Sequence, residues 1–481
     1  PLDKLWGVDD FFAPVLAANP ELRYLAISDA AGRLLFLSGQ APPALADHYA
    51  SGDLPDSAAT SRAVIDDCVD IGLPLAGRSR VEGAVHVGVD RGFVSGRLAD
   101  IAYDVAVVAL VSLLVAVEIL LFTVAVNVTG PMRAVSALID RGRAGDFTRI
   151  SAVRSQDEVG RFVQSFNAAI RRFQAYVEEV RTAHFDRRVP ARAAAIEARV
   201  AARFRFSPHG RPDPGTRVHA GLIRLPLFLF VFAEELSRSF LPLHARGLPG
   251  VWPGLTPELA AAVPIAVFMA VVALASPVAA GAGHRMGGRR LFLTGLVPSL
   301  LGLTLSAFAT TWFEFTLWRA LTAVGYALVT MACQAHVARA VVEGEQRRRV
   351  RGLGIYVGAV LTASLCGTGL GGVLAERFGV GLVFLFGAGL ALVSGLMIAA
   401  LLPAEPAAAT EPADPASAPP SAGLWRNGRF LVVTLFAAMP AKMALTGAFF
   451  FLVPQMLATL PDVAAGDGGR LMMLYPLGVV A

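Results

Sequence analysis

The chain has 481 residues, of which 55% are apolar and 16% charged, and its mean hydropathy is +0.58. This composition excludes an ordinary soluble globular protein and requires membrane helices in part of the chain. The net charge of +5 does not indicate a nucleic-acid partner, because the arginines form short clusters between apolar runs, as membrane topology favours.

The cysteines are too few and too far apart for a metal or redox motif. Cys68, Cys333 and Cys366 have no neighbour at ligand spacing, so we expect no disulfide framework. The sequence has no nucleotide-binding glycine loop, metal cluster or nucleophile elbow, which argues against an enzyme and a bound cofactor. Because the chain starts at Pro1 without a methionine and stops inside an apolar run at Ala481, we expect an excerpt that lacks a preceding membrane helix.

Residues 1–100 alternate short β-like runs with turn signals and are no more apolar than a soluble domain. Two hairpins are predicted, with strands at 24–28 and 34–37 and at 69–75 and 81–89. This pattern of a mixed sheet with preceding helices resembles the Cache or PAS-like sensor domains that bacterial receptors carry outside the membrane. A small α/β domain with a structural role is the alternative.

The segment 101–128 contains a predicted transmembrane helix. Its apolar core runs from Val105 to Val128, about the ~20 residues that a helix needs to cross a bilayer. Glu118 falls near mid-membrane, where an ionisable group is costly unless it is protonated or paired. One hypothesis gives Glu118 a signalling role; the hypothesis we favour is a protonated carboxyl that packs between the helices of a dimer.

The segment 129–181 carries the most specific pattern in the sequence. It predicts a helix, a connector containing glycine, and a second helix in which apolar residues recur at steps of three and four, as in a coiled-coil seam. The seam residues are Val159, Phe162, Phe166, Ala169, Phe173, Tyr176 and Val180. The whole segment resembles a HAMP domain, and the positions that carry the resemblance are Pro131, Gly145, Asp157, Glu158, Gly160, Phe166 and Asn167.

The HAMP resemblance implies a parallel four-helix bundle made by two chains, which relays movement of a membrane helix. A single chain would leave one apolar face of each helix in water, so a homodimer is expected. HAMP modules lie on the cytoplasmic side, which places residues 1–100 outside the cytoplasm. An amphipathic linker, the alternative, would explain the periodicity but not the junction residues.

Residues 182–218 are a basic cytoplasmic linker in this interpretation. Their arginines lie on a predicted helix that rests on anionic lipid or continues the signalling helix, and prolines then predict a flexible joint. From residue 219 the chain changes to apolar segments with very short connections. Spans are predicted at 222–241, 258–280, 291–310, 316–338, 352–374, 380–402 and 429–452, with an eighth from Leu471.

The loops of this region divide by charge. If the chain enters from the cytoplasm, the arginine-rich loops after the second and fourth spans are cytoplasmic, in agreement with the HAMP placement. The segment 403–427 contains nothing that could form a core and is similar to the cytoplasmic central loop of a major facilitator. Residues 219–402 would then be the first six-helix half, and 428–481 the start of an incomplete second half.

Three local patterns support the same resemblance. The loop after the second span is similar to the family's loop motif at Gly281, Arg289 and Arg290, although Arg285 stands where the family has an acid that helps to lock the cytoplasmic side shut. In the fourth span, Arg319 matches an arginine that assists proton coupling in many members. Fifth-span glycines resemble the glycine-rich antiporter motif, with simple helix packing as the alternative: Gly358, Gly367, Gly371 and Gly372.

The first span carries three charged residues. Glu234 and Arg238 are four apart on one helical face, which allows an ion pair, while Glu235 points about a hundred degrees away. Such charges need partners or water, so a central water-filled cavity is the expected setting, and a solvated helix end is the alternative. Through the internal repeat of the fold, Lys442 lies at comparable depth and is a candidate partner for Glu235 or for an anionic substrate.

These features predict a multidomain membrane protein with an α/β sensor domain, a transmembrane helix with a HAMP helical bundle, and all-α major-facilitator helices. The expected function is secondary active transport of a small-molecule solute in the bacterial inner membrane, coupled to protons and regulated by a sensory ligand through a HAMP homodimer. The lipid bilayer is a partner and nucleic acid is not. The alternative is a receptor whose carrier-like helices sense without transporting. Titratable groups inside the membrane favour transport, and the altered loop motif favours the receptor.

Overall fold

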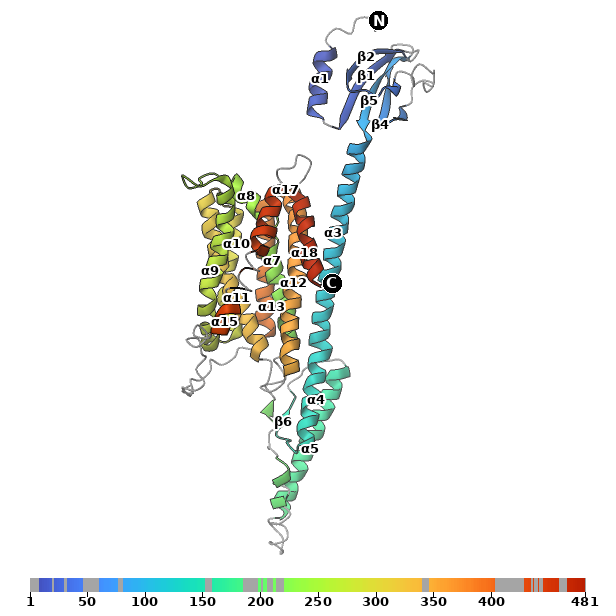
Figure 1. The fold of residues 1–481 in the computed structure, drawn as a ribbon. Coiled ribbons are helices and arrows are strands. Elements are labelled where there is room, and N and C mark those ends of the chain that lie inside the picture. The colour runs from blue at the N-terminus through green and yellow to red at the C-terminus, as the bar shows by residue number, and fades with distance from the viewer. Residues whose placement is uncertain are drawn as a thin grey trace. The chain divides into compact units, whose positions relative to one another are not determined.

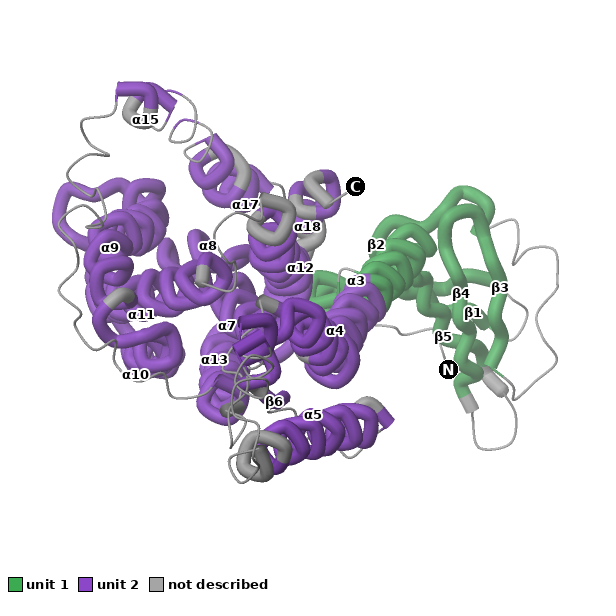
Figure 2. Tube along the Cα trace, turned by 90° about the horizontal axis from the view of Figure 1, so that it is seen from below, with its two compact units in different colours: residues 1–106 green, residues 107–481 purple. Residues whose placement is uncertain are grey.

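The computed structural model divides into two compact units, residues 1–106 and 107–481, which Figure 2 colours separately. Figure 1 labels the helices and strands. The structure describes residues 8–19, 21–29, 33–45, 60–76, 81–151, 158–184, 198–199, 202–205, 211–212, 220–339, 346–402, 428–433, 436, 440, 444–457 and 465–480.

The first unit contains helix α1 (Val8–Ala18) and a five-stranded sheet. The strands are β1 (Leu22–Asp29), β2 (Leu34–Gly39), β3 (Ser61–Ile65), β4 (Cys68–Ala76) and β5 (Val81–Asp90), in the order β2-β1-β5-β4-β3. Both predicted hairpins, β1 with β2 and β4 with β5, are confirmed. The predicted mixed sheet is wrong, because every strand pair in this sheet is antiparallel. Short loops can join antiparallel neighbours, whereas parallel neighbours need a crossover of about a dozen residues.

Strand β1 is buried along most of its length. Alternate side chains of a strand point to opposite faces, and both faces of β1 are covered. Tyr24 and Ala26 pack with Leu45, Ile65 and Cys68 on one face. Leu25 and Ile27 pack with Phe12 of α1 on the other.

Strand β5 leads directly into helix α3 (Arg91–Val124). The Asp90 carboxylate caps this helix by accepting hydrogen bonds from the backbone N–H groups of Gly92 (2.7 Å) and Phe93 (3.3 Å). A π-helical turn, η1 (Ala125–Thr129), then joins α3 to α4 (Gly130–Arg143), so the backbone is helical from residue 91 to residue 143. The predicted separate helices are therefore one run, because Pro131 lies in the first turn of α4, where a missing N–H is tolerated.

Helix α5 (Glu158–His184) follows the connector, which agrees with the predicted order of helix, connector and helix. The short strand β6 (Arg149–Ile150) of the connector pairs in parallel with β7 (Arg211–Pro212). Gly145 has φ +80°, a left-handed conformation that glycine adopts without strain. This residue ends α4 as the sequence predicts.

The rest of the second unit is helical. Its elements are η3 (Ala220–Ile223), α7 (Arg224–Glu235), α8 (Leu241–Gly247), α9 (Pro257–Met286), α10 (Gly288–Ala307), α11 (Trp312–Arg339), α12 (Gln346–Phe378), α13 (Val380–Leu401), α15 (Gly428–Val433), η6 (Leu445–Leu452), α17 (Val453–Leu457) and α18 (Ala465–Val480). Within the described residues, 6 helical segments are long and apolar enough to cross a membrane, at 91–143, 257–283, 288–307, 312–338, 350–378 and 380–401. The predicted second to sixth spans fall on α9 to α13.

The connections between the predicted spans are shorter than expected at one place, and the last predicted segments are described only in part. The loop predicted between the second and third spans is mostly helical, since α9 continues to Met286 and only Gly287, with φ +80°, separates it from α10. The predicted span 429–452 is described only in pieces, α15 and η6. The predicted central loop 403–427 lies outside the described residues.

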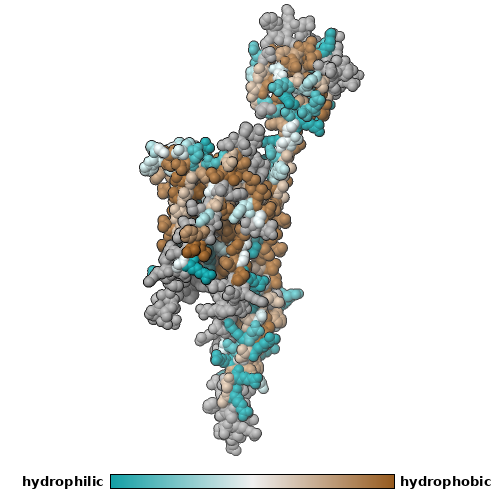
Figure 3. Space-filling view, viewed as in Figure 1, coloured by the Kyte–Doolittle hydropathy of each residue, from teal (hydrophilic) through white to brown (hydrophobic). Residues whose placement is uncertain are grey.

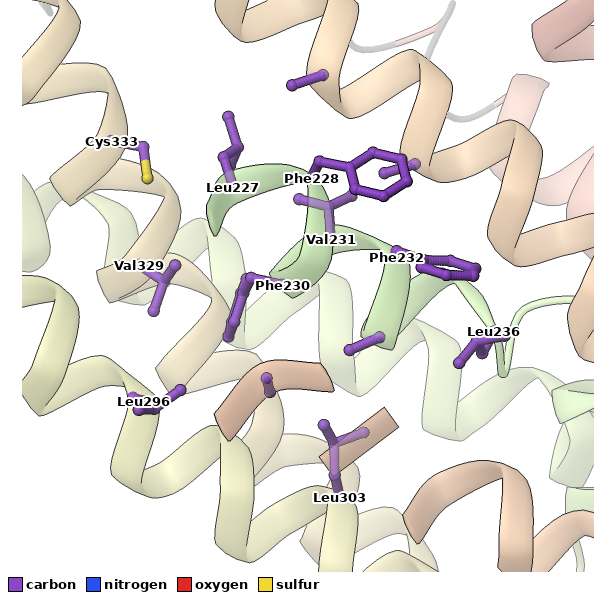
Figure 4. Close-up of a cluster of buried hydrophobic side chains, with 14 of the residues drawn as sticks. Leu227, Phe228, Phe230, Val231, Phe232, Leu236, Leu296, Leu303, Val329 and Cys333 are labelled. Atoms are coloured by element: carbon purple, nitrogen blue, oxygen red, sulfur yellow. The ribbon is translucent and has the colours of Figure 1, made fainter. Parts of the chain in front are cut away.

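Helix α7 lies inside the helical bundle and packs against both α12 and α13. Ten of its 12 residues are buried, as expected for a helix that is apolar all round. Figure 4 shows its labelled side chains directed to several sides, among them Phe230 and Phe232, with Leu296 of α10 and Val329 of α11 in the same cluster. The face of the bundle that Figure 3 shows is mostly apolar, and exposed apolar side chains such as Leu274, Val278 and Leu396 suit a lipid environment.

Candidate functional site

The first predicted span, 222–241, is interrupted in the structure. Helix α7 ends at Glu235, residues 236–240 form a turn that we call the helix break, and α8 begins at Leu241. Pro242 explains the interruption, because in a continuous helix its ring would clash with the carbonyl oxygen four residues earlier. The hydroxyl of Ser237 donates to the Glu234 carbonyl oxygen at 3.1 Å, which satisfies a backbone group that the break would otherwise leave unpaired.

Two buried ion pairs meet at the helix break. Arg319 of α11 donates from Nη2 to the Glu234 carboxylate, and both side chains are about 95% buried. Arg238 pairs with Glu235 at 2.8 Å between Nη2 and Oε1. Ser364 of α12 donates to the other oxygen of Glu235 at 3.1 Å. We call Glu234, Glu235, Arg238 and Arg319 the paired-charge cluster.

The predicted pairing of Glu234 with Arg238 is wrong. That prediction assumed a continuous helix, in which residues four apart share a face. In the structure Arg238 pairs with Glu235, three residues away, instead of with Glu234, four residues away. Glu234 is then paired with Arg319, which the sequence singled out in another span without indicating this partner.

A phenyl ring covers each guanidinium of the cluster. The Arg319 guanidinium lies over the Phe268 ring of α9 at 4.7 Å, and the Arg238 guanidinium lies over the Phe450 ring of η6 at 4.6 Å. Such contacts are worth more when the cation is shielded from water. Each arginine is thus held by one carboxylate and one aromatic face.

A small cavity opens beside the cluster. It offers about 40 Å³ of space for the centres of water molecules, and its lining includes Glu234, Arg238, Arg319, Phe268 and Phe450. A water molecule needs roughly 10–15 Å³ of such space, so the cavity has room for about three. The sequence predicted a central water-filled cavity beside these charges; the structure places Glu234, Arg238 and Arg319 in the lining of this small cavity, without Glu235.

The fifth-span glycines divide into two groups. Gly367 and Gly371 of α12 face the helix break, and a Cβ at either position would overlap Glu235 or the carbonyl oxygen of Leu236. Gly358 has open space around it, since the nearest atom to an added Cβ is 3.9 Å away. Gly372 is buried in the same helix. The close approach of α12 to the break therefore depends on Gly367 and Gly371.

The loop motif contributes one interhelical contact. Arg289 donates from Nη2 to the carbonyl oxygen of Ala399 in α13 at 2.8 Å, which ties the start of α10 to the end of α13. Arg285, Arg290 and Gly281 are exposed. The residue in the acid position of the motif, Arg285, thus faces outward.

Glu118 of α3 has a partner that the sequence did not suggest. Arg224, the first residue of α7, donates from Nε and Nη2 to both oxygens of the Glu118 carboxylate, each at 2.7 Å. Glu118 is 1% exposed. The favoured prediction, a protonated carboxyl between two chains, is wrong, because an arginine of the same chain neutralises the charge in bidentate geometry. The sequence feature that could have indicated this partner is the position of Arg224, directly before the apolar run of the first span.

The residues of the HAMP resemblance hold the connector in place. Asn167 of α5 binds Ser151 twice, accepting from its backbone N–H and donating to its carbonyl oxygen, both at 3.0 Å. Phe166 lies beside Phe162, while Pro131, Gly145 and Gly160 are buried. Glu158 is exposed at the start of α5.

The apolar residues of α5 lie on two sides of the helix. The buried ones are Val163 and Ile170, whereas the predicted seam residues Phe162 and Tyr176 are 55% and 64% exposed. The contact within the chain therefore does not use these seam residues. Asp157 and Lys442, both predicted as functional, lie outside the described residues.

The first unit contains a buried chain of polar side chains that sequence reasoning missed. Tyr24 donates from its hydroxyl to Asp70 Oδ1 at 2.8 Å, Asp70 Oδ2 contacts His86 Nδ1 at 3.0 Å, and His86 Nε2 contacts the Ser28 hydroxyl at 2.9 Å. All four residues are 1% exposed or less, so the Ser-His-Asp order does not meet a surface at which a substrate could react. The sequence feature that could have indicated this chain is the presence of Asp70 and His86, two polar residues, inside apolar strands.

Burial raises the pKa of Tyr24, and the Asp70 carboxylate raises it further, so the hydroxyl remains a hydrogen-bond donor. In the connector, the Thr148 hydroxyl donates to Asp146 at 2.6 Å and lowers the pKa of that carboxyl. In the described part of the chain, no group of three or more His, Cys, Asp or Glu side chains is arranged to hold a metal ion.

Comparison with known proteins gives one family match. The family model described as "Major Facilitator Superfamily" matches residues 227–481. No curated protein matches the chain. Among solved structures, the chain is similar to a peptide transporter POT in complex with sulfate, with 15% identity over 49% of this chain and 48% of the other and a TM-score of 0.33.

A POT family transporter in complex with 5-aminolevulinic acid is similar at 15% identity over 50% of this chain and 49% of the other, with a TM-score of 0.33. The chain therefore spans about half the length of these structures.

The glycine contacts at the helix break lead to a stability prediction. Replacing Gly371 by alanine should destabilise the protein by about 1–3 kcal/mol, because the added methyl group overlaps the Leu236 carbonyl oxygen in a packed interior. The matched Gly358→Ala change should be neutral or stabilising, because alanine favours a helix and meets no atom within van der Waals overlap. Thermal unfolding of the purified variants measures both effects. Equal unfolding midpoints for the two variants would show that α12 does not approach the break as closely as described.

Proposed function

The chain belongs to the major facilitator superfamily, and from that membership we propose that it is a proton-coupled secondary transporter whose activity is regulated by its N-terminal domain. The observation that carries the transport proposal is the paired-charge cluster beside a cavity at an interrupted helix. Discontinuous membrane helices with buried polar groups are the usual setting of transporter binding sites. Charges buried in the bilayer are expensive and mark functional sites by default.

The Glu234–Arg319 pair supports the proton-coupling part of the proposal. The pair joins α7 to α11, so relative movement of these helices would separate the two charges. A carboxylate that loses its cationic partner in an apolar interior takes up a proton, and the return of the arginine expels it. The other groups near Glu234 are Glu235 with its partner Arg238, and the phenol of Tyr326.

Replacing Glu234 by glutamine should separate proton coupling from solute exchange. In proteoliposomes, uptake driven by a proton gradient should fall about tenfold or more, because the amide cannot exchange a proton. Counterflow of the same solute, which needs no net proton movement, should persist. The solute is first identified by screening flux across solute classes. The exposed helix-start residue Glu314 offers the matched control Glu314→Gln, which should behave like the parent. Undiminished proton-driven accumulation in Glu234→Gln would exclude this residue as the proton carrier.

The Glu118–Arg224 pair supports regulation by the N-terminal domain. We infer that residues 1–100 form a Cache or PAS-like sensor, and that α3 transmits its state. Helix α3 follows β5 without an intervening residue, and Glu118 holds this helix to the first residue of α7. Val107, Leu114 and Phe122 of α3 also pack against the core of the helical bundle. Movement of α3 would therefore act on the helix that carries the paired-charge cluster.

Replacing Glu118 by alanine should uncouple the sensor from flux. In the parent chain, removal of residues 1–90, which leaves α3 intact, should change the flux of the screened solute. In Glu118→Ala the same removal should have a much smaller effect, because Arg224 no longer links α3 to α7. The unpaired arginine should also lower stability by about 3–5 kcal/mol. Thr123→Val, on an exposed part of the same helix, is the matched control. If removal of residues 1–90 leaves parent flux unchanged, regulation by this domain is wrong.

The exposed seam of α5 supports the proposed HAMP homodimer. Phe162 and Tyr176 remain exposed in one chain, and a second chain would bury them in a four-helix bundle. Tyr176→Asp should shift the protein in detergent from dimer toward monomer, measured by light scattering. Gln164→Asp, at an exposed position off the seam, should not. A monomeric parent chain would contradict the homodimer.

The proposed location is the bacterial inner membrane, with residues 1–100 outside the cytoplasm and residues 129–181 within it. The clustering of arginines at the α9–α10 and α11–α12 junctions supports this topology. A receptor without transport activity is the second candidate, favoured by Arg285 at the position of the family's acid. Absence of flux for every solute class in the screen would support it.

A further inference from the structure

Arg319 has hydrogen-bonding capacity that its neighbours do not use. Its Nη2 donates to Glu234, while Nε and Nη1 are buried without a hydrogen-bond partner among the described residues. These two atoms carry three of the five N–H donors of a guanidinium. Buried donors are normally satisfied, so an unsatisfied pair on a residue that is 4% exposed marks a place where an acceptor is expected.

The surroundings of Arg319 define what the acceptor can be. The cavity beside it is also lined by Arg238, whose partner Glu235 lies on the α12 side, and by Glu234, whose charge Arg319 already neutralises. A cation entering this space would meet two guanidinium groups and would find both carboxylates already paired. An oxygen anion would meet free N–H donors, and charge-assisted hydrogen bonds are the strong ones.

The size and lining of the cavity indicate which kind of ligand would carry this acceptor. The described space holds about three water molecules, which is the size of one carboxylate group. The remaining lining is largely apolar and comes from α8, α9 and η6: Leu241, Ile265, Phe268, Met269 and Phe450. Apolar walls beside a charged end suit an organic molecule with one anionic group.

We propose that this cavity binds the carboxylate of a small organic anion through the free N–H groups of Arg319, with the apolar part of the ligand between Phe268 and Phe450. The proposal rests on the proposed transport function and deepens it, since it names the substrate class. Arg319 is the anion-binding residue, and Arg238, held over Phe450 in the lining of the same cavity, supplies a second positive charge.

Binding to the purified full chain tests the charge requirement directly. The probes are benzoate, benzamide and benzylammonium, which share a ring and differ in charge, and acetate with acetamide as a smaller pair. Dissociation constants come from the shift of the thermal unfolding midpoint in detergent. Benzoate or acetate should bind about tenfold or more tightly than its uncharged partner, and benzylammonium should bind no better than benzamide.

Two arginine variants localise the site. Arg319→Gln should weaken anion binding about tenfold or more, whereas Arg246→Gln, which removes an exposed arginine at the end of α8, should leave it unchanged. Arg319→Lys, which keeps the charge but has fewer donors, should bind with intermediate affinity. Because the comparison of probes uses the parent chain, poor folding of Arg319→Gln does not remove the test.

The outcomes separate this proposal from the transport proposal. Equal or better binding of the neutral or cationic probes, binding of neither anion, or full binding in folded Arg319→Gln would each overturn the anion site. Proton-driven flux of a neutral or cationic solute would also overturn it while leaving transport intact. Anion binding that depends on Arg319, together with no flux in any solute class, would support the site and contradict transport.

Discussion

A charged side chain inside an apolar helical bundle must be neutralised by a partner, because the bundle offers little water to solvate it. Three buried ion pairs meet this requirement in the second unit, and all of them involve α7 or the break that follows it. Glu118 and Arg224 join α3 to the start of α7. Glu234 and Arg319 join its end to α11. The positions of these helices relative to one another are therefore set by electrostatics as well as by packing.

The two ion pairs of the paired-charge cluster lie at the helix break. Pro242 interrupts the helix, and Gly367 and Gly371 of α12 let that helix lie close to the backbone of residues 235–236. Two phenyl rings cover the guanidinium groups. The chain belongs to the major facilitator superfamily, and in the transport function that we propose this pairing is the group that would take up and release a proton.

The first unit applies the same rule to hydrogen bonds. Tyr24, Asp70, His86 and Ser28 hydrogen-bond to one another across three strands, which offsets the cost of burying polar groups in the sheet core. From this sheet, α3 begins without a linker, capped by Asp90. The Glu118–Arg224 pair holds this helix to α7, and it is the contact through which we propose that the first unit regulates transport.

Sequence patterns alone determined the hairpins of residues 22–39 and 68–90, the helix–connector–helix order after Pro131, and the positions of α9 to α13. These features depend on the local period of apolar residues and on glycine or proline at their ends, which a sequence displays directly. Tertiary structure decided the antiparallel sheet, the break in the first span, and every partner of the buried charges: Arg224 for Glu118, Arg319 for Glu234, and Arg238 for Glu235. The sequence shows which charged residues lie inside the apolar segments. Which of them pair depends on backbone geometry and on contacts between residues up to 106 positions apart, and local spacing encodes neither.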